Sequence, residues 1–210
     1  MDQKNDTSIR SYSTRALAES ALLIAAATVL SLYAVFKLPN GGSITICSMI
    51  PIILISTKYS FFWSLTAAFA YSLIQMIFGF YAPPVQNLLN YCLVVLLDYI
   101  LAFSVLCLAG PIFRWLKKTW TVRVRLLIAA VICFVLRFLC HYTSGVIIWG
   151  TYASADQPIW LYSLLYNGSY MLCECLISGI VIFLAGQKLA TAFMESDLIS
   201  RYSRGSTNML

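Results

Sequence analysis

LLIAAVICFVLRFLCHYTSGVIIW, residues 126–149, is the stretch that decides the fold. It exceeds the roughly 20 apolar residues that a helix needs to cross a hydrocarbon core. Similar runs occur at Ala16–Phe36, Ser60–Phe80, Leu88–Ile112 and Ile159–Gly186. Of the 210 residues, 60% are hydrophobic and only 10% are charged, a composition that excludes a water-soluble globular fold. We therefore expect an all-α integral membrane protein.

A sixth apolar segment, Ile44–Thr57, is only 14 residues long, a length at which a re-entrant or buried segment is the usual alternative. Charge placement favours a short span, because Lys and Arg accumulate in cytoplasmic loops. With six spans, one side of the membrane holds only Lys37. The other side holds Lys4, Arg10, Arg15, Lys58, Arg114, Lys117, Lys118, Arg123, Arg125, Lys188, Arg201 and Arg204. We expect six transmembrane helices with cytoplasmic N- and C-termini, and no nucleic-acid partner for the net charge of +6.

This topology predicts a cytoplasmic N-terminal segment at 1–15, a six-helix membrane domain at 16–186 and a cytoplasmic tail at 187–210. The seven Cys lie nearly all within spans and lack the spacing of a metal site. We interpret them as small apolar packing residues. Neither a metal site nor a cofactor is predicted.

Four ionisable residues fall at membrane depth: Asp98, Arg137, His141 and Glu174. Such groups are costly in lipid and are candidates for function. A structural ion pair between Arg137 and Glu174 is the simpler interpretation, with Asp98 as the alternative partner of Arg137. Asp98 otherwise has no obvious protein partner, so we expect it to meet a cationic or hydrogen-bond-donating ligand.

Arg137, His141, Gly145 and Trp149 recur every four residues and predict one polar, small and aromatic helix face. Gly145 would let a flat ring approach the backbone between its neighbours. The alternatives are that Gly145 permits close helix packing and that Trp149 belongs to the interfacial aromatic belt. Taken together, these residues favour a ligand-binding face.

Span six begins with aromatic residues and carries Tyr162 and Asn167, which point about 140° apart on a regular helix. Both contact one ligand only if it lies across the helix, or if the helix is irregular at Gly168. Tyr162 is equally consistent with an interfacial belt residue. In the outer loop before the second span, Gly41 and Gly42 predict either a simple turn or a lid over a bound ligand.

Five segments in this order resemble the substrate-binding (S) components of energy-coupling factor transporters, and among them the thiamine-specific ones. They are Glu19–Ala25, Gly41–Thr45 with Ser48–Ile52, Leu97–Phe103, the Arg137-x-x-x-His141-x-x-x-Gly145-x-x-x-Trp149 face, and Leu161–Gly168. The resemblance covers roughly residues 16–186. It implies a six-helix thiamine-binding subunit, without enzymatic activity, in the plasma membrane of a prokaryote.

The resemblance also implies roles for individual residues. Asp98 would hydrogen-bond the aminopyrimidine of thiamine beside Tyr99, and Trp149 would stack on the rings with cation–π support from the thiazolium. The remaining binding residues would be His141, Gly145, Tyr162 and Asn167. Ala21 and Ala25 would dock a transmembrane coupling subunit, which works with two ATPases; close packing within this chain is the alternative.

Three other functions remain open at this point. The ligand could be another vitamin or a thiamine precursor such as hydroxymethylpyrimidine. The chain could be a stand-alone proton-coupled carrier with Asp98 as its proton site. A membrane enzyme using His141 with Glu174 or Asp98 is disfavoured, because the chain has one His and no metal-ligand spacing. The sequence also lacks a phosphate-binding loop, so transport would draw its energy from elsewhere.

Overall fold

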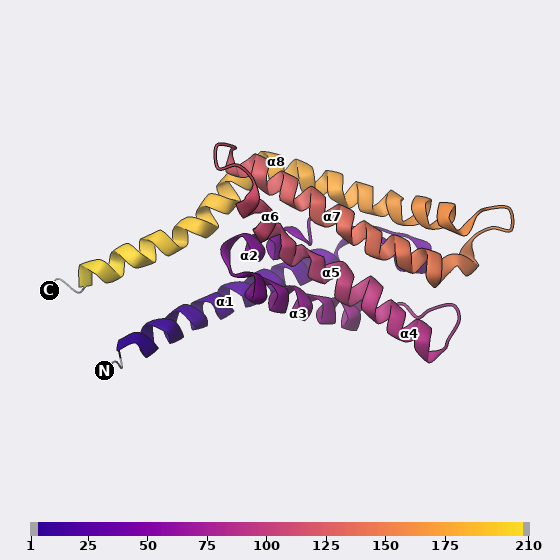
Figure 1. Ribbon diagram of the computed structural model, residues 1–210, viewed down its shortest axis with the longest axis horizontal. Helices are drawn as coiled ribbons and strands as arrows, with labels where there is room; N and C mark the ends of the chain where they lie inside the picture. Colours follow the sequence, from indigo (N-terminus) through magenta and orange to yellow (C-terminus); the bar gives the residue numbers. More distant parts are fainter. Residues whose placement is uncertain (1–3, 208–210) are drawn as a thin grey trace.

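The computed structural model describes residues 4–207, and the side chains of residues 14–193. The elements in chain order are α1 (Lys4–Leu32), β1 (Ala34–Lys37), a 3₁₀ turn (Pro39–Gly41), β2 (Ser43–Thr45), α2 (Ile50–Lys58), α3 (Phe61–Gly79), α4 (Leu88–Val94), a π-helix (Val95–Leu101), α5 (Ala102–Ser104), a 3₁₀ turn (Val105–Leu108), α6 (Ala109–Trp115), α7 (Val122–Ile147), a 3₁₀ turn (Trp149–Tyr152) and α8 (Ile159–Thr207). The stretch from α4 to α6 is one helical pass of changing pitch (Figure 1).

Both ends of the described chain lie at the same end of the bundle (Figure 1). The turn between α6 and α7, which carries the basic residues of 114–125, lies at that end too. The last residue of α2, Lys58, reaches the same side, because its Nζ lies 2.6 Å from Glu19 Oε2 on α1. The predicted all-α membrane fold of six passes with both termini on the basic, cytoplasmic side is confirmed.

Four helical stretches are long and apolar enough to cross a membrane by themselves: Thr14–Leu32, Phe61–Gly79, Leu88–Trp115 and Ile159–Phe193. The other two passes are α2 and α7. Helix α2 has nine residues, so it rises only about 13 Å along its axis. It crosses the bundle from within, since Ile50–Thr57 are all buried.

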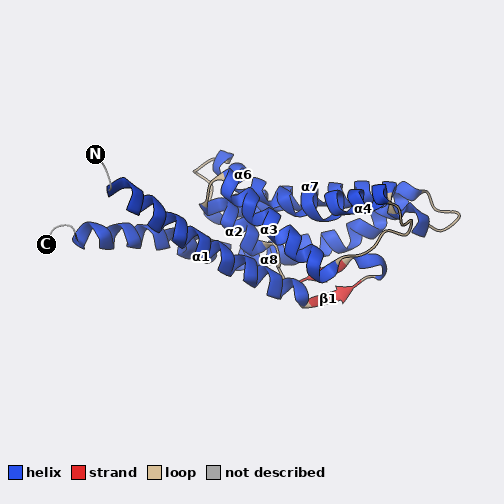
Figure 2. Cartoon of the chain, turned by 90° about the horizontal axis from the view of Figure 1, so that it is seen from below, coloured by secondary structure: helices blue, strands red, loops and turns tan. Residues whose placement is uncertain are grey.

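Two predicted span boundaries were wrong at the outer face. The end of the first predicted span, Ala16–Phe36, and the start of the second, Ile44–Thr57, form an antiparallel hairpin of β1 and β2. The hairpin lies at the end of the bundle away from the termini (Figure 2). Asn40 and Gly41, with φ of 66° and 95°, make the tight turn between the strands. Apolar length alone could not distinguish a short helix from a strand that continues into one.

Helices α2 and α6 touch through their backbones in the cytoplasmic half. A Cβ placed on Gly110 would lie 1.9 Å from the carbonyl oxygen of Ser56, so only glycine fits there. Ser56 Oγ donates to Cys107 O at 2.6 Å and accepts from Gly110 N at 2.7 Å. The small residues therefore bring two backbones together and satisfy the polar groups they bury.

Capping residues fix where three of the helices begin. The side chains of Ser60, Asn87 and Thr121 accept hydrogen bonds from backbone N–H groups three residues later, at 3.4, 2.8 and 3.4 Å. Such caps satisfy N–H groups that a helix start leaves unpaired. Both predicted tail boundaries, 15/16 and 186/187, fall inside the continuous helices α1 and α8. Residues 1–3 and 208–210 of those predicted tails lie outside the described residues.

Candidate ligand-binding site

A cavity of about 430 Å³ opens at the outer end of the bundle. This volume lies within the usual range for small-molecule sites. Its walls come from the β1–β2 hairpin, the end of α3, the π-helix, α7 and α8. Six of the seven predicted ligand-binding residues line it: Asp98, Tyr99, His141, Trp149, Tyr162 and Asn167.

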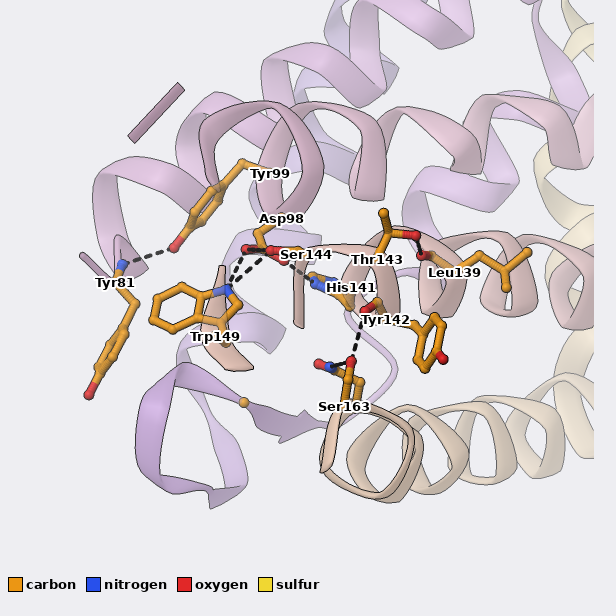
Figure 3. A network of polar contacts seen from close by, with 12 residues as sticks. Tyr81, Asp98, Tyr99, Leu139, His141, Tyr142, Thr143, Ser144, Trp149 and Ser163 are labelled. Carbon is orange, nitrogen blue, oxygen red and sulfur yellow. Dashed lines mark hydrogen bonds and ion pairs between the residues drawn. The ribbon is translucent and has the colours of Figure 1, made fainter. Parts of the chain in front are cut away.

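Asp98 is the centre of a hydrogen-bond network (Figure 3). Its Oδ1 lies 2.9 Å from His141 Nδ1. Its Oδ2 accepts from Ser144 Oγ at 2.5 Å and from Trp149 Nε1 at 3.0 Å. The expectation that Asp98 has no protein partner was therefore wrong. The carboxylate is held by three side chains from α7 and the turn that follows it, which fixes its orientation toward the cavity.

The π-helix explains how Asp98 and Tyr99 both reach the site. Its seven residues, Val95–Leu101, replace the regular α-helical pitch in the middle of this pass, and such insertions are frequent at functional sites. Tyr99 OH donates to Gly79 O at 2.8 Å and accepts from Tyr81 N at 3.0 Å. The ring thereby ties the end of α3 to the cavity wall.

The irregular helix is the fourth pass and not the sixth. Helix α8 runs without a break through Gly168, so Tyr162 and Asn167 stay on different sides of a regular helix. Asn167 Nδ2 donates to Ser163 Oγ at 3.1 Å, and its Oδ1 accepts from Tyr170 OH at 2.9 Å. Tyr162 lies near the outer end of α8, and its ring stacks on that of Tyr166 with ring centroids 5.7 Å apart.

Gly145 lies at a helix contact and does not line the cavity. A Cβ at this position would stand 2.2 Å from Ser163 Oγ and 2.7 Å from Asn167 Nδ2. Its geometry matches close packing between α7 and α8. Trp149 begins the 3₁₀ turn after α7, so it does not continue the four-residue repeat on the α7 face. Its indole still reaches the site, because Nε1 donates to Asp98 Oδ2.

Arg137 and Glu174 lie deeper in the same cavity. The two side chains form an ion pair with 3.4 Å between Arg137 Nη1 and Glu174 Oε2, and both are at least 90% buried. The guanidinium also lies 4.2 Å from the centroid of the Phe103 ring. Of the two partners that the sequence left open for Arg137, Glu174 is the one in contact.

Three buried side-chain polar atoms have no hydrogen-bond partner within the part of the chain whose side chains are described: Arg137 Nε, His141 Nε2 and Tyr162 OH. All three residues line the cavity. An unsatisfied buried polar group costs about 1–3 kcal/mol, so this clustering favours a polar ligand that completes the bonds.

Sequence reasoning did not assign Phe80, Tyr166 and Tyr170 to the lining, nor Ser144, which holds Asp98, and it left open whether Tyr71, Gln75 and Tyr81 reach the cavity. Tyr81 and Gln75 line the cavity, whereas Tyr71 is fully buried behind it and its hydroxyl faces Ala27 O at 3.4 Å. A search for side chains that carry charge near neutral pH passes over Ser and Tyr. The usable signal was the position of Ser144 three residues after His141, on nearly the same helix face.

Comparison with known proteins agrees with this geometry. A family described as "Thiamine transporter protein" matches residues 17–194. The thiamine transporter ThiT of Bacillus subtilis (strain 168) is 34% identical over 178 residues, which is 80% of this chain and 88% of the relative. ThiT of Lacticaseibacillus paracasei is 23% identical over 64% of this chain and 68% of its own length.

A solved structure of ThiT from Listeria monocytogenes superposes with a TM-score of 0.69 at 25% sequence identity. The match covers 87% of this chain and 98% of that one. Sequence and structure therefore agree over nearly the whole membrane part, and the chain belongs to the thiamine transporter protein family.

Proposed function

We propose that this chain is the membrane-embedded subunit that captures thiamine from outside the cell, the S component of an energy-coupling factor transporter. The chain belongs to a family of thiamine transporters, and it is a multi-pass protein of the bacterial plasma membrane and not an enzyme. The observation that carries the proposal is the cavity itself, where an oriented carboxylate, a Trp ring and unpaired polar atoms meet.

The charge of the cavity suits a monovalent cation. The charged groups that line its interior are the buried Glu174 and Arg137 and the partly buried Asp98, which sum to one negative charge with a neutral His141. Lys37, the other charged residue of the lining, is exposed at the rim. Thiamine carries one permanent positive charge on its thiazolium ring. Burying a charge costs much free energy unless an opposite charge lies nearby.

The individual roles follow from what each side chain presents. Asp98 accepts from the amino group of the pyrimidine, with Tyr99 supporting the wall beside it. Trp149 offers its face to the cationic ring. His141 Nε2 and Tyr162 OH supply the unpaired polar atoms, and Asn167 completes the polar wall. Gly145 acts from outside the cavity by allowing α7 to approach α8.

The partners that we propose are a transmembrane coupling subunit and two ATPases. Ala21 and Ala25 are exposed on α1, so they do not pack inside this chain and are free to meet another helix. Purified chain in liposomes should bind thiamine but accumulate none until the partner subunits and ATP are added. Accumulation by the chain alone would support a stand-alone carrier instead.

Calorimetric titration with thiamine and with its neutral hydroxymethylpyrimidine half tests the ligand. We expect thiamine to bind at least about 100-fold more tightly, because only thiamine brings the cation that balances the cavity, a difference of about 2.7 kcal/mol. Equal affinities would mean that the thiazolium charge is not recognised. If thiamine binds equally well when Trp149 is replaced by Phe, the binding site lies elsewhere in the protein.

A further inference from the structure

One face of α8 holds the outer hairpin along three successive turns, through Tyr166, Tyr170 and Glu174. Tyr166 OH donates to Pro39 O and accepts from Gly42 N at 3.0 Å. The Tyr170 ring lies directly beneath Gly42, where an added Cβ would come within 3.0 Å of it. Because these residues are four apart, they form a continuous line along the helix. We call it the α8 seam.

Glu174 makes the innermost contact of the α8 seam, and its closest partners are on the hairpin. Its Oε1 accepts from Thr45 N at 2.8 Å and from Thr45 Oγ1 at 2.5 Å, whereas the contact of Oε2 with Arg137 is longer, at 3.4 Å. Thr45 and Glu174 are 6% and 3% exposed, so water does not compete for these bonds. Short bonds to a buried carboxylate are the strong kind.

We infer that Glu174 is a positioning residue that fixes β2 to α8 and thereby holds the hairpin wall of the cavity in place. Gly42, Ser43 and Thr45 all line that cavity. The outer end of the α8 seam is different in kind, since Pro39 and Gly41 are exposed and Tyr166 is only partly buried. The segment 38–42 is therefore held less firmly than Thr45. The inference deepens the proposed function, but its test needs no ligand.

The simpler role for Glu174 is as counter-ion of Arg137, holding α7 to α8. The two roles predict different consequences of removing Arg137. If Glu174 acts through the ion pair, Arg137→Gln should disturb the bundle as much as Glu174→Ala. If Glu174 acts through Thr45, the hairpin should stay in place without Arg137, because neither Thr45 bond involves the guanidinium.

Hydrogen–deuterium exchange of the ligand-free, purified protein distinguishes these roles, read on segments 38–42 and 43–47. In the wild type we expect 38–42 to exchange faster than 43–47. Glu174→Ala should accelerate 43–47 at least about tenfold, and Glu174→Gln, which keeps an acceptor for Thr45, should restore most of the protection. Arg137→Gln should leave 43–47 protected, and only Met49, whose Sδ lies 2.7 Å from Arg137 Nη1, should lose a contact.

Thr45→Val keeps the test valid if Glu174→Ala fails to fold, because it keeps the bond from Thr45 N to Glu174 and removes the hydroxyl, which contacts both Glu174 Oε1 and Ser48 Oγ. We expect about threefold faster exchange of 43–47 in Thr45→Val, and none in Thr66→Val, whose hydroxyl is exposed and bonds its own helix at Phe62 O. Tyr166→Phe should accelerate 38–42 alone. Unchanged exchange of 43–47 in both Glu174→Ala and Thr45→Val, or equal acceleration of 43–47 by Arg137→Gln, would overturn the inference.

Discussion

The two halves of the bundle are built on opposite principles. In the cytoplasmic half, α2 is buried along its length and meets α6 backbone to backbone at Gly110 and Ser56. In the outer half, the same passes give way to a hairpin, a π-helix and a cavity of about 430 Å³ with three unpaired polar atoms. Close packing stabilises the cytoplasmic half, whereas the outer half is packed less closely and leaves room for a ligand.

This contrast teaches that stability and binding reside in different places along the same helices. Helix α7 illustrates it, because its inner part packs Leu126, Ala129 and Cys133 into the core, while its outer part presents His141 and Ser144 to Asp98. Substitutions in the inner half should therefore change the melting temperature, and substitutions in the outer half should change affinity. The following variants test this separation.

Gly110→Ala should have the largest effect. The new Cβ would lie 1.9 Å from Ser56 O, so α2 and α6 must move apart and break the bonds of Ser56. We expect a loss of about 3 kcal/mol and a fall in melting temperature of about 10 °C, measured by thermal unfolding of the purified protein.

Gly168→Ala is the matched control, because an added Cβ there meets nothing closer than 3.8 Å. This variant should melt at or slightly above the wild-type temperature, since Ala favours a helix over Gly by about 1 kcal/mol. Equal melting of the two variants would show that the backbone contact between α2 and α6 is not tight, and the proposed division of the bundle would fail.

Ser144→Ala should weaken thiamine binding about tenfold, because Asp98 loses a donor that fixes its orientation, and should lower the melting temperature less than Gly110→Ala. The variant removes the 2.5 Å donor to Asp98 Oδ2, and a bond to a charged acceptor contributes about 1.5–3 kcal/mol. Calorimetric titration measures the effect. Thr143→Val on the same helix is the control, since the Thr143 hydroxyl bonds Leu139 O and points away from the network (Figure 3). A similar loss in both variants would argue against a specific role for Ser144.

Ala21→Leu with Ala25→Leu should have the smallest effect on binding. Both residues are exposed on α1 and lie outside the cavity lining, so thiamine affinity should change less than about twofold, well below 1 kcal/mol. Uptake with the partner subunits should be lost if these residues form the docking face. Normal uptake would exclude that face as the contact with the coupling subunit.

The features predicted from sequence were those that hydrophobicity and charge determine directly. Long apolar runs gave the passes, and the asymmetry of Lys and Arg gave the topology. Asp98, Arg137, His141 and Glu174 stood out because charge at membrane depth is rare. Their positions in one cavity agree with that reasoning.

The features that were missed depend on backbone geometry and on neutral polar groups. The short second span begins as a strand, because 43–45 pairs with β1 in a way that apolar length does not reveal. The π-helix at Asp98 has no marker in composition. Ser144 was overlooked because a hydroxyl costs less free energy to bury than a charged group and so does not stand out in an apolar span. Its importance arises only from the Asp98 carboxylate that the fold brings beside it. The partners of Asp98 likewise required the arrangement of α7 against the fourth pass.

Thiamine titration of Asp98→Asn tests the central claim most directly, because the variant keeps the shape of the side chain and removes the charge at the centre of the cavity. The account predicts an affinity at least about 100-fold lower, close to 3 kcal/mol. An affinity within about threefold of the wild type would contradict it, since the outer cavity around Asp98 could not then be the thiamine site.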